Sequence, residues 1–280
     1  MISEAEAQEL LESKDLIAIG MRADEIRRKR HGGQTTFVRV FEIHVDVQPA
    51  SLPSRTSAGE FRIVGSPRSL DAATAAVRNG RSVAGEVPLT GFSLADLVTL
   101  EGSSSLADTL RALREAGLEA ISEVPLDRLD HAETAIAEAR AAGLTVRRLT
   151  VDVQQPDDRM ALAHRARTLQ NTVGGFHAFA PLSRTMSISS PTTGYDDVKQ
   201  VALSRLVADN ITSIQVDWQL YGPKLAQFAL TIGADDVDAV AAVDAGTLGT
   251  RRSPIEEIRG NIRAAGLEPV ERNGRFEAIG

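Results

Sequence analysis

The sequence predicts an α/β fold, a TIM-type (βα)8 barrel with an N-terminal helical extension. Short runs rich in branched and aromatic residues alternate with longer amphipathic stretches along most of the 280 residues. This alternation is typical of βα units around a parallel sheet. With 42% hydrophobic residues, a chain of this length can bury one full core, and barrels of this size are commonly undivided. We therefore expect residues 1–35 to form a helical cap and residues 36–280 to form a single barrel domain.

The runs expected to form strands are short, rich in β-branched or aromatic residues and bounded by turn residues. They are Thr36–His44, Phe61–Val64, Ser82–Val87, Ala120–Ser122, Val146–Val151, Phe176–Ala180, Ser213–Val216 and Val237–Ala241. Eight parallel strands close a barrel of this type, so the number of runs fits the predicted fold.

The stretches between these runs have the apolar spacing of helices. Several end at a glycine, such as Gly80, Gly117 and Gly143, the residue most common just beyond a helix C-terminus. The expected helices are Leu70–Asn79, Leu94–Ala116, His131–Ala142, Asp157–Thr172, Asp196–Asn210, Gly222–Ile232 and Pro254–Ala265. Two further helices, Glu4–Ser13 and Met21–Arg30, precede the first strand and are expected to pack on the bottom or side of the barrel.

Composition excludes several classes of function. A net charge of −7 without a long basic block gives no electrostatic reason to expect nucleic acid or an anionic membrane as a partner. No apolar run approaches the roughly 20 residues of a membrane span, and the acidic first residues do not fit a signal peptide. We therefore expect a cytoplasmic protein. The absence of cysteine excludes disulfides, thiolate zinc sites and a thiol nucleophile.

Several segments in the second half of the chain carry a family pattern. Gly174–Leu182 reads GGFHAFAPL, Gly233–Asp238 reads GADDVD, and Ile214–Gly233 continues into the latter without a break. Together with Arg22–Gly32, these segments resemble the radical SAM aminofutalosine synthase and dehypoxanthinyl-futalosine cyclase family of menaquinone biosynthesis. The resemblance is continuous from roughly Leu110 to the C-terminus. It implies a radical-SAM-like barrel.

Compared with this family, the chain lacks several of the segments that bind the cofactors. In this family, three thiolates of a C-x3-C-x2-C loop after the first strand hold a [4Fe–4S] cluster, but here Val47–Gly59 has Gln48–Ser51 where cysteines are expected. The turn expected to hold SAM is replaced by Val64–Pro67, and a glycine-rich turn is replaced by Ser122–Asp127. We therefore expect a degenerate member with no [4Fe–4S] cluster, without SAM as a cofactor and without radical SAM activity.

Candidate functional side chains follow the expected strands. In this fold, such groups collect at the C-terminal ends of the strands. Glu42, His44 and Asp46 are the candidates for acid–base catalysis, and His44, Asp46 and Asp152 are candidate ligands of Mg²⁺ or Mn²⁺. The alternative is that the carboxylates only cap helix N-termini. Glu86 and Glu123 are also expected at this rim, and the candidate ligand-binding residues are Arg184, Asp217, Trp218, Tyr221, Asp235, Asp236 and Asp238.

Trp218 is the only tryptophan of the chain and lies close to Tyr221. At a strand-to-helix turn, the pair could provide a stacking surface for a purine or another flat ring. The alternative is a residue that packs at the barrel rim.

Three functions fit these observations. The first is a non-radical paralogue of aminofutalosine synthase, a pseudoenzyme or accessory protein that binds a futalosine-type compound and acts beside a true radical SAM paralogue. The second is an active non-radical enzyme that uses the acidic rim, with or without Mg²⁺ or Mn²⁺, on a related nucleoside or enol-pyruvyl compound. The third is a structural partner subunit whose barrel mouth is filled by its own side chains.

Overall fold

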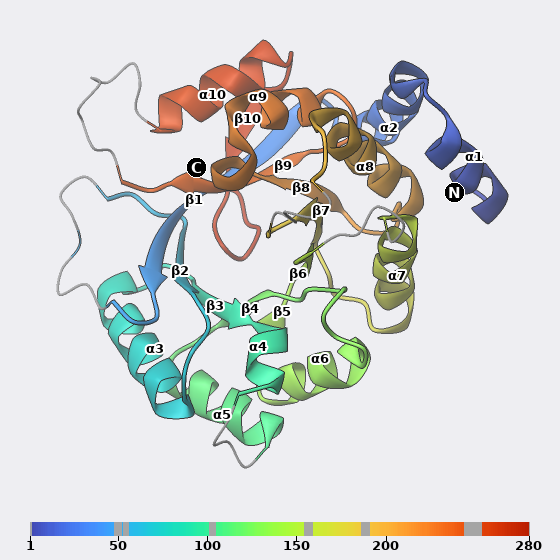
Figure 1. The fold of residues 1–280 in the computed structure, drawn as a ribbon. Coiled ribbons are helices and arrows are strands. Elements are labelled where there is room, and N and C mark those ends of the chain that lie inside the picture. The colour runs from blue at the N-terminus through green and yellow to red at the C-terminus, as the bar shows by residue number, and fades with distance from the viewer. Residues whose placement is uncertain are drawn as a thin grey trace.

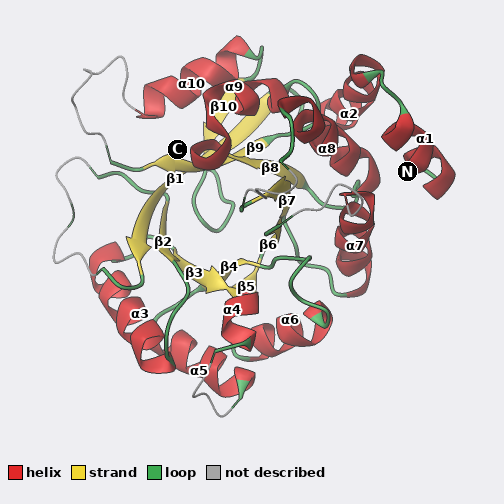
Figure 2. Cartoon of the chain, in the orientation of Figure 1, coloured by secondary structure: helices red, strands yellow, loops and turns green. Residues whose placement is uncertain are grey.

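A ring of parallel strands forms the centre of the molecule, and helices surround it (Figures 1 and 2). The computed structural model describes residues 2–47, 52, 56–100, 105–153, 159–185, 191–243 and 254–279. The remnant of the cluster loop expected at Gln48–Ser51 lies outside the described residues.

The strands follow one another around the ring in parallel. They are β1 (Gln34–His44), β2 (Glu60–Val64), β3 (Leu89–Ser93), β4 (Ala120–Glu123), β5 (Thr145–Val146), β6 (Arg148–Val151), β7 (Ala178–Ser183), β8 (Ser213–Asp217), β9 (Asp236–Ala241) and β10 (Glu268–Glu271). Their order is β5-β4-β3-β2-β1-β9-β8-β7-β6, and β10 pairs with β1. A parallel bridge between Pro125, which follows β4, and Thr150 of β6 spans the gap in the ring. The sheet is therefore a nearly closed barrel, and the predicted fold class is confirmed.

The helices alternate with the strands on the outside of the ring. They are α1 (Glu4–Glu12), α2 (Leu16–His31), α3 (Leu70–Ala84), α4 (Leu94–Val98), α5 (Leu106–Ala116), α6 (Ala132–Ala141), α7 (Arg159–Thr172), α8 (Gly194–Val207), α9 (Trp218–Leu230) and α10 (Pro254–Ala264). None of the helices in the described part of the chain is long and apolar enough to cross a membrane.

The expected third strand, Ser82–Val87, is wrong. Helix α3 continues to Ala84 because small residues recur at helical spacing on its buried face, and it ends at Gly85, which has a φ of 56°. The true strand, β3, starts at Leu89. Glu86 therefore lies in the turn that precedes β3, at the opposite end of the barrel from the rim where it was expected.

Two other expected elements are divided. The helix expected at Leu94–Ala116 consists of α4 and α5, and the Ser105 side chain caps α5 by accepting a hydrogen bond from the Asp108 amide. The strand expected at Val146–Val151 is interrupted at Arg147, so that β5 pairs with β4 and β6 pairs with β7. Strand β10 was not expected from the sequence.

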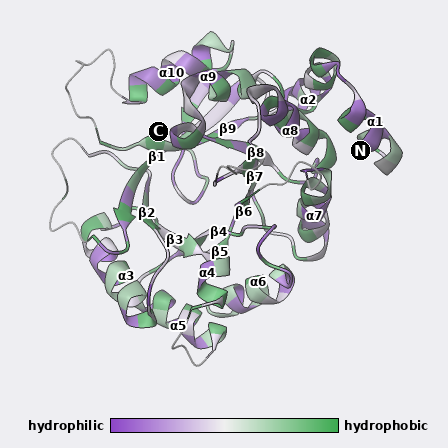
Figure 3. Ribbon diagram, viewed as in Figure 1, coloured by the Kyte–Doolittle hydropathy of each residue, from purple (hydrophilic) through white to green (hydrophobic). Residues whose placement is uncertain are grey.

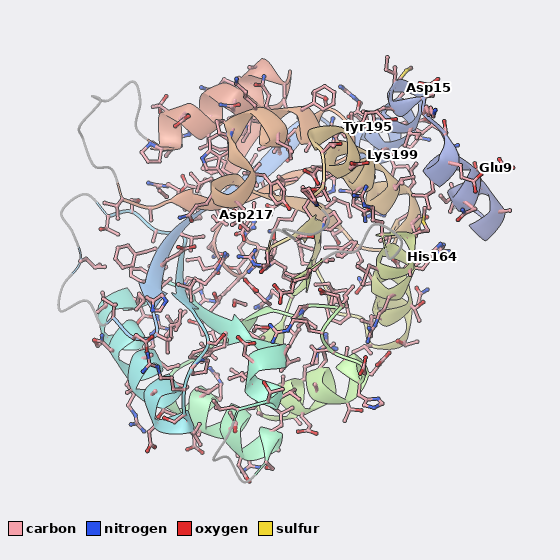
Figure 4. All side chains as sticks on the ribbon, in the orientation of Figure 1. Glu9, Asp15, His164, Tyr195, Lys199 and Asp217 are labelled. Atoms are coloured by element: carbon pink, nitrogen blue, oxygen red, sulfur yellow. The ribbon has the colours of Figure 1, made fainter. Side chains whose placement is uncertain are left out.

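The N-terminal helices pack on the side of the barrel. Helix α2 contacts α8, and α1 contacts α7 and α8. The close approach of α2 requires Gly20, where an added Cβ would lie 2.8 Å from Ile232 Cγ2. Lys199 donates hydrogen bonds to Leu11 O and Ser13 O, and Tyr195 donates one to Lys14 O (Figure 4). These bonds hold the α1–α2 turn against α8.

The apolar core lies between the strands and the surrounding helices. Along the strands, hydrophobic residues (green in Figure 3) are interspersed with hydrophilic ones (purple). Outward-facing residues such as Ile43, Ile63 and Leu89 are fully buried against helix α3, where all three approach Gly80. The inside of the barrel differs, because it is lined largely by charged and polar side chains.

Candidate functional site at the carboxyl ends of the strands

Buried ion pairs fill the centre of the barrel. Arg62 makes two hydrogen bonds of 2.9 and 2.8 Å to the Asp238 carboxylate and one of 2.8 Å to Glu60. Arg148 also pairs with Asp238. Only a void of about 20 Å³ remains here, which is enough for about one water molecule. The middle of the barrel is therefore occupied by the protein's own side chains.

The C-terminal segment adds further buried charges to this polar centre from the amino-terminal end of the barrel. Arg272 forms two hydrogen bonds of 2.6 Å to Asp236. Its guanidinium lies 4.0 Å from the centre of the Phe276 ring, which in turn packs on His177 with ring centroids 4.3 Å apart. Figure 1 shows this red C-terminal segment turning into the middle of the ring. It closes the amino-terminal end of the barrel.

A cavity remains open at the carboxyl ends of the strands. Its volume is about 360 Å³, within the range of small-molecule sites. The strands β2, β3, β4, β6 and β7 each supply residues at their ends. Residues that line it include Gly65, Ser66, Phe92, Ser93, Asp96, Glu123, Arg128, Asp152, Arg184 and Thr185.

A first chain of polar contacts runs along one wall of this cavity. Arg128 lies between two carboxylates, 3.1 Å from Asp96 and 3.1 Å from Asp152. The Ser66 hydroxyl donates to Asp96 at 2.5 Å, and the Thr185 hydroxyl donates to Asp152 at 2.8 Å. The Asp152 carboxylate is therefore already paired with the Arg128 guanidinium and the Thr185 hydroxyl.

A second chain of contacts links the cavity to β8 and α9. Arg184 lies 2.7 Å from Glu123 and 3.3 Å from Asp217. Asp217 also accepts the Leu220 amide at 2.9 Å and so caps α9. Burial raises the pKa of Asp217, and the nearby Asp238 carboxylate raises it further. The expected helix-capping role of a rim carboxylate is thus realised at Asp217.

Glu42, His44 and Asp46 are not gathered into one site. Glu42 lies beside Arg62 in the β1–β2 register and faces the barrel. Glu42 is exposed, and partial burial of its carboxyl group raises the pKa; Arg62 opposes this increase, and Asp217 and Asp238 add to it. His44 and Asp46 are exposed, with 4.0 Å between the His44 Nδ1 and Asp46 Oδ2 atoms.

The candidate metal ligands are likewise separated. Asp152 follows β6, whereas His44 and Asp46 follow β1, on a different side of the ring. Within the described ranges, no group of three or more histidine, aspartate and glutamate side chains is arranged to hold a metal ion.

The three aspartates around β9 do not share a location. Asp235 precedes the strand at the amino-terminal end and pairs with the buried Arg205 of α8. Asp236 holds Arg272, and Asp238 lies in the barrel centre. Asp238 lies close enough to the mouth for its charge to raise the pKa values of Glu42 and Asp217.

Trp218 and Tyr221 lie next to the cavity wall at the start of α9. Both are half-buried, and the Tyr221 hydroxyl donates a hydrogen bond of 2.6 Å to Ser183 O. Neither residue lines the 360 Å³ cavity. Their connection to it runs through Asp217 and Arg184.

Three residues other than glycine in the described backbone have positive φ, and two of them, Phe92 and Ala239, belong to strands of the barrel. Phe92, with φ of 62°, lines the cavity, and Ala239, with φ of 56°, follows Asp238. Such conformations cost free energy in residues other than glycine, and they cluster at ligand and active sites. In addition, Ser93 Oγ is buried without a hydrogen-bond partner. These features favour the mouth cavity as the functional site.

Sequence reasoning missed most of the residues that build this site. Arg62, Arg148 and Arg272 were not singled out, and neither were Asp96 and Arg128. The available signal was the two-residue spacing of Glu60 and Arg62, which places both side chains on one face of a strand.

Comparison with known proteins identifies related sequences. Residues 176–279 match the family model described as the CofH/MqnC C-terminal region. The aminodeoxyfutalosine synthase of Streptomyces coelicolor is 30% identical over 69% of this chain and 60% of its own length. The enzyme of the same name from Thermus thermophilus is 29% identical over 61% of this chain and 55% of its own length. The chain thus spans somewhat more than half the length of these curated relatives.

A second group of relatives and the solved structures complete the comparison. A 5-amino-6-(D-ribitylamino)uracil–L-tyrosine 4-hydroxyphenyl transferase of Methanosarcina barkeri is 30% identical over 51% of this chain and 43% of its own length. The crystal structure of methylornithine synthase (PylB) superposes with a TM-score of 0.62 at 13% identity, over 96% of this chain and 94% of that chain. The maturase HydG from Carboxydothermus hydrogenoformans superposes with a TM-score of 0.64 at 13% identity, over 96% and 76%. These structures support the radical-SAM-like barrel fold.

Proposed function

Since this chain is a cysteine-free member of the radical SAM aminofutalosine synthase family, we propose that it is a non-radical paralogue that binds a futalosine-type compound at the barrel mouth. The cavity of about 360 Å³ at the carboxyl ends of the strands carries this proposal. The likeness to aminodeoxyfutalosine synthases supports a role beside a true radical SAM paralogue in menaquinone biosynthesis.

The residues present do not fit a [4Fe–4S] cluster. Thiolates hold such clusters, and the sequence contains no cysteine. The turn after β2, where the family resemblance implies contacts to SAM, consists of Gly65 and Ser66, and Ser66 is bonded to Asp96. A step that depends on a cluster or on SAM is therefore not part of the proposed function.

Anaerobic reconstitution with iron and sulfide is expected to leave the protein without a stoichiometric cluster. The reason is the absence of thiolate ligands from the whole sequence. Iron and sulfide analysis, with assay of 5′-deoxyadenosine, measures this outcome. Stoichiometric cluster together with 5′-deoxyadenosine formation would contradict the non-radical assignment.

Binding of aminofutalosine is expected to change the fluorescence of Trp218, the only tryptophan. Trp218 adjoins Asp217, which reaches the cavity through Arg184. If a purine stacks on the indole, Trp218→Ala should weaken binding by roughly 1–3 kcal/mol, measured by isothermal titration calorimetry. Phe228→Ala is the matched control, because Phe228 is an exposed aromatic residue at the other end of the same helix, away from Asp217. Absence of binding by every futalosine-type compound would refute the proposal.

A second candidate is an enzyme that uses carboxylates of the mouth as acid and base. The Glu42 and Asp217 carboxyl groups favour it, because they lie close enough for their charges to interact and burial raises the pKa of each, the direction that suits an acid catalyst. Turnover of a nucleoside or enol-pyruvyl compound that is lost in Glu42→Gln would support this candidate.

The third candidate is a structural subunit, which the ion pairs filling the barrel centre favour. Co-purification with a radical SAM paralogue, without ligand binding, would support it.

A further inference from the structure

A second concavity lies at the amino-terminal end of the barrel, opposite the mouth. Its volume is about 420 Å³. It lies where α6 ends and where β5 and β7 begin. The residues that line it include Arg140, Thr145, Arg147 and Gly175. It contributes nothing to the mouth cavity, so it is independent of the function proposed above.

Arg147 contributes an unpaired charge to this concavity. It lies in the break between β5 and β6, and its side chain donates a hydrogen bond to the Thr145 hydroxyl. No carboxylate lies within ion-pair distance of it in the described part of the chain. Burial lowers the pKa of Arg147 and the nearby Arg275 lowers it further, whereas the Glu277 and Glu119 carboxylates act in the opposite direction. An anion placed here would therefore stabilise the guanidinium.

Arg140 contributes a second, rigidly held guanidinium. It lies 5.3 Å from the centre of the Phe176 ring and donates hydrogen bonds to Val173 O at 3.1 Å and Gly174 O at 2.6 Å. These partners are neutral, and burial alone lowers the pKa of Arg140. Gly175, with φ of 75°, allows this approach, because an added Cβ there would lie 2.8 Å from Arg140 Nη2.

The surroundings add to the positive charge. Arg114 reaches within 3.5 Å of the position that a Cβ on Gly143 would occupy. Glu119 is the nearest buried carboxylate, but it already pairs with Arg81 and Arg275, each at 2.8 Å. Glu277 is exposed and accepts a hydrogen bond from Asn273 at 2.8 Å. This end of the barrel is therefore locally cationic, although the whole chain has a net charge of −7.

We propose that this concavity is a binding site for a small multivalent oxyanion, held by Arg147 and Arg140. Guanidinium groups present paired N–H donors that match the oxygens of phosphate or carboxylate, and hydrogen bonds between two charged groups are the strongest kind. The volume exceeds that of a single phosphate, so it accommodates a diphosphate or a tricarboxylate. Arg140 is preorganised by its carbonyl contacts, and Arg147 supplies the charge that lacks a partner.

The test uses the full chain and two anions as probes, inorganic pyrophosphate and citrate. Titration calorimetry at low ionic strength is expected to detect binding that weakens steeply as salt is added. Arg147→Gln should weaken it at least tenfold, roughly the loss of one charge-assisted hydrogen bond, and Arg147→Lys should weaken it less because it keeps the charge. Arg78→Gln is the matched control, since Arg78 is an exposed arginine of α3 outside the concavity.

The two probes also identify the source of the oxyanion. Preference for pyrophosphate indicates a phosphorylated ligand, and preference for citrate indicates a polycarboxylate. The inference is overturned if neither anion binds below millimolar concentration, or if Arg78→Gln loses as much affinity as Arg147→Gln. Circular dichroism of each variant confirms that it is folded.

Discussion

Replacement of Asp238 by asparagine is expected to destabilise the protein by about 3–5 kcal/mol. Asp238 is fully buried and is the carboxylate shared by Arg62 and Arg148 in the barrel centre. Asparagine keeps the volume but leaves two buried guanidinium groups with too little negative charge. The free energy of unfolding, from urea denaturation at neutral pH, measures the loss.

The control variant is Asp46→Asn at the exposed rim. Asp46 lies 3.8 Å from the exposed Arg68, and exposed pairs contribute at most about 1 kcal/mol. A loss for Asp238→Asn no larger than that for Asp46→Asn would contradict the structural role assigned to the buried network.

The pairing of Asp238 with Arg62 and Arg148 also predicts how the stability of the protein depends on pH. Burial alone would raise the pKa of Asp238, but Arg148 and Arg62 hold it well below its usual value. A carboxyl group whose pKa is depressed by folding stabilises the protein fully above its unfolded pKa, and this contribution disappears as the pH falls toward the folded pKa. The difference in stability between the native protein and Asp238→Asn should therefore shrink below about pH 4.

The fold could be predicted from the sequence because each βα unit repeats the same local signals. The failure at Ser82–Val87 is instructive, since Val83, Ala84 and Val87 resemble a short strand. In the structure, the small residues Ala76 and Gly80 let helix α3 pack closely against β1–β3, and the helix continues to Ala84. The sequence predicts a helix end at Gly80, but this glycine lies inside α3, so the residues that follow it were wrongly assigned to a strand.

The candidate site was harder to predict because the residues that pair with one another there are far apart in the chain. Arg62 and Asp238 are separated by 176 positions, and Arg148 and Asp238 by 90. The expected strand ends pointed to Arg184, Asp217 and Asp152; in the structure Arg184 and Asp152 line the mouth cavity, and Asp217 pairs with Arg184. Nothing local distinguishes Asp235 from Asp236, yet the reversal of side-chain direction along a strand sends one toward α8 and the other into the barrel.

Replacement of Arg272 by methionine should release the C-terminal segment from the barrel and cost about 3–5 kcal/mol. Arg272 is buried, forms two hydrogen bonds to Asp236 and packs on Phe276. Its loss leaves the Asp236 carboxylate buried with only the neutral donors Thr36 and Gln215. Residues 273–279 should then exchange their amide hydrogens faster, as measured by hydrogen–deuterium exchange, while α3 and α5 should be unaffected.

Two further variants separate the ion pair from simple packing. Arg275→Met is the control, because Arg275 is partly exposed and pairs with Glu119 outside the barrel. In the double variant Asp236→Leu/Arg272→Met, both charges are removed, so stability should recover part of the loss seen in Arg272→Met alone. The charge pair is not what fixes the C-terminal segment if the double variant loses more stability than Asp236→Leu and Arg272→Met lose together as single variants. Shape complementarity of Arg272 and Phe276 would then carry the closure of this end of the barrel.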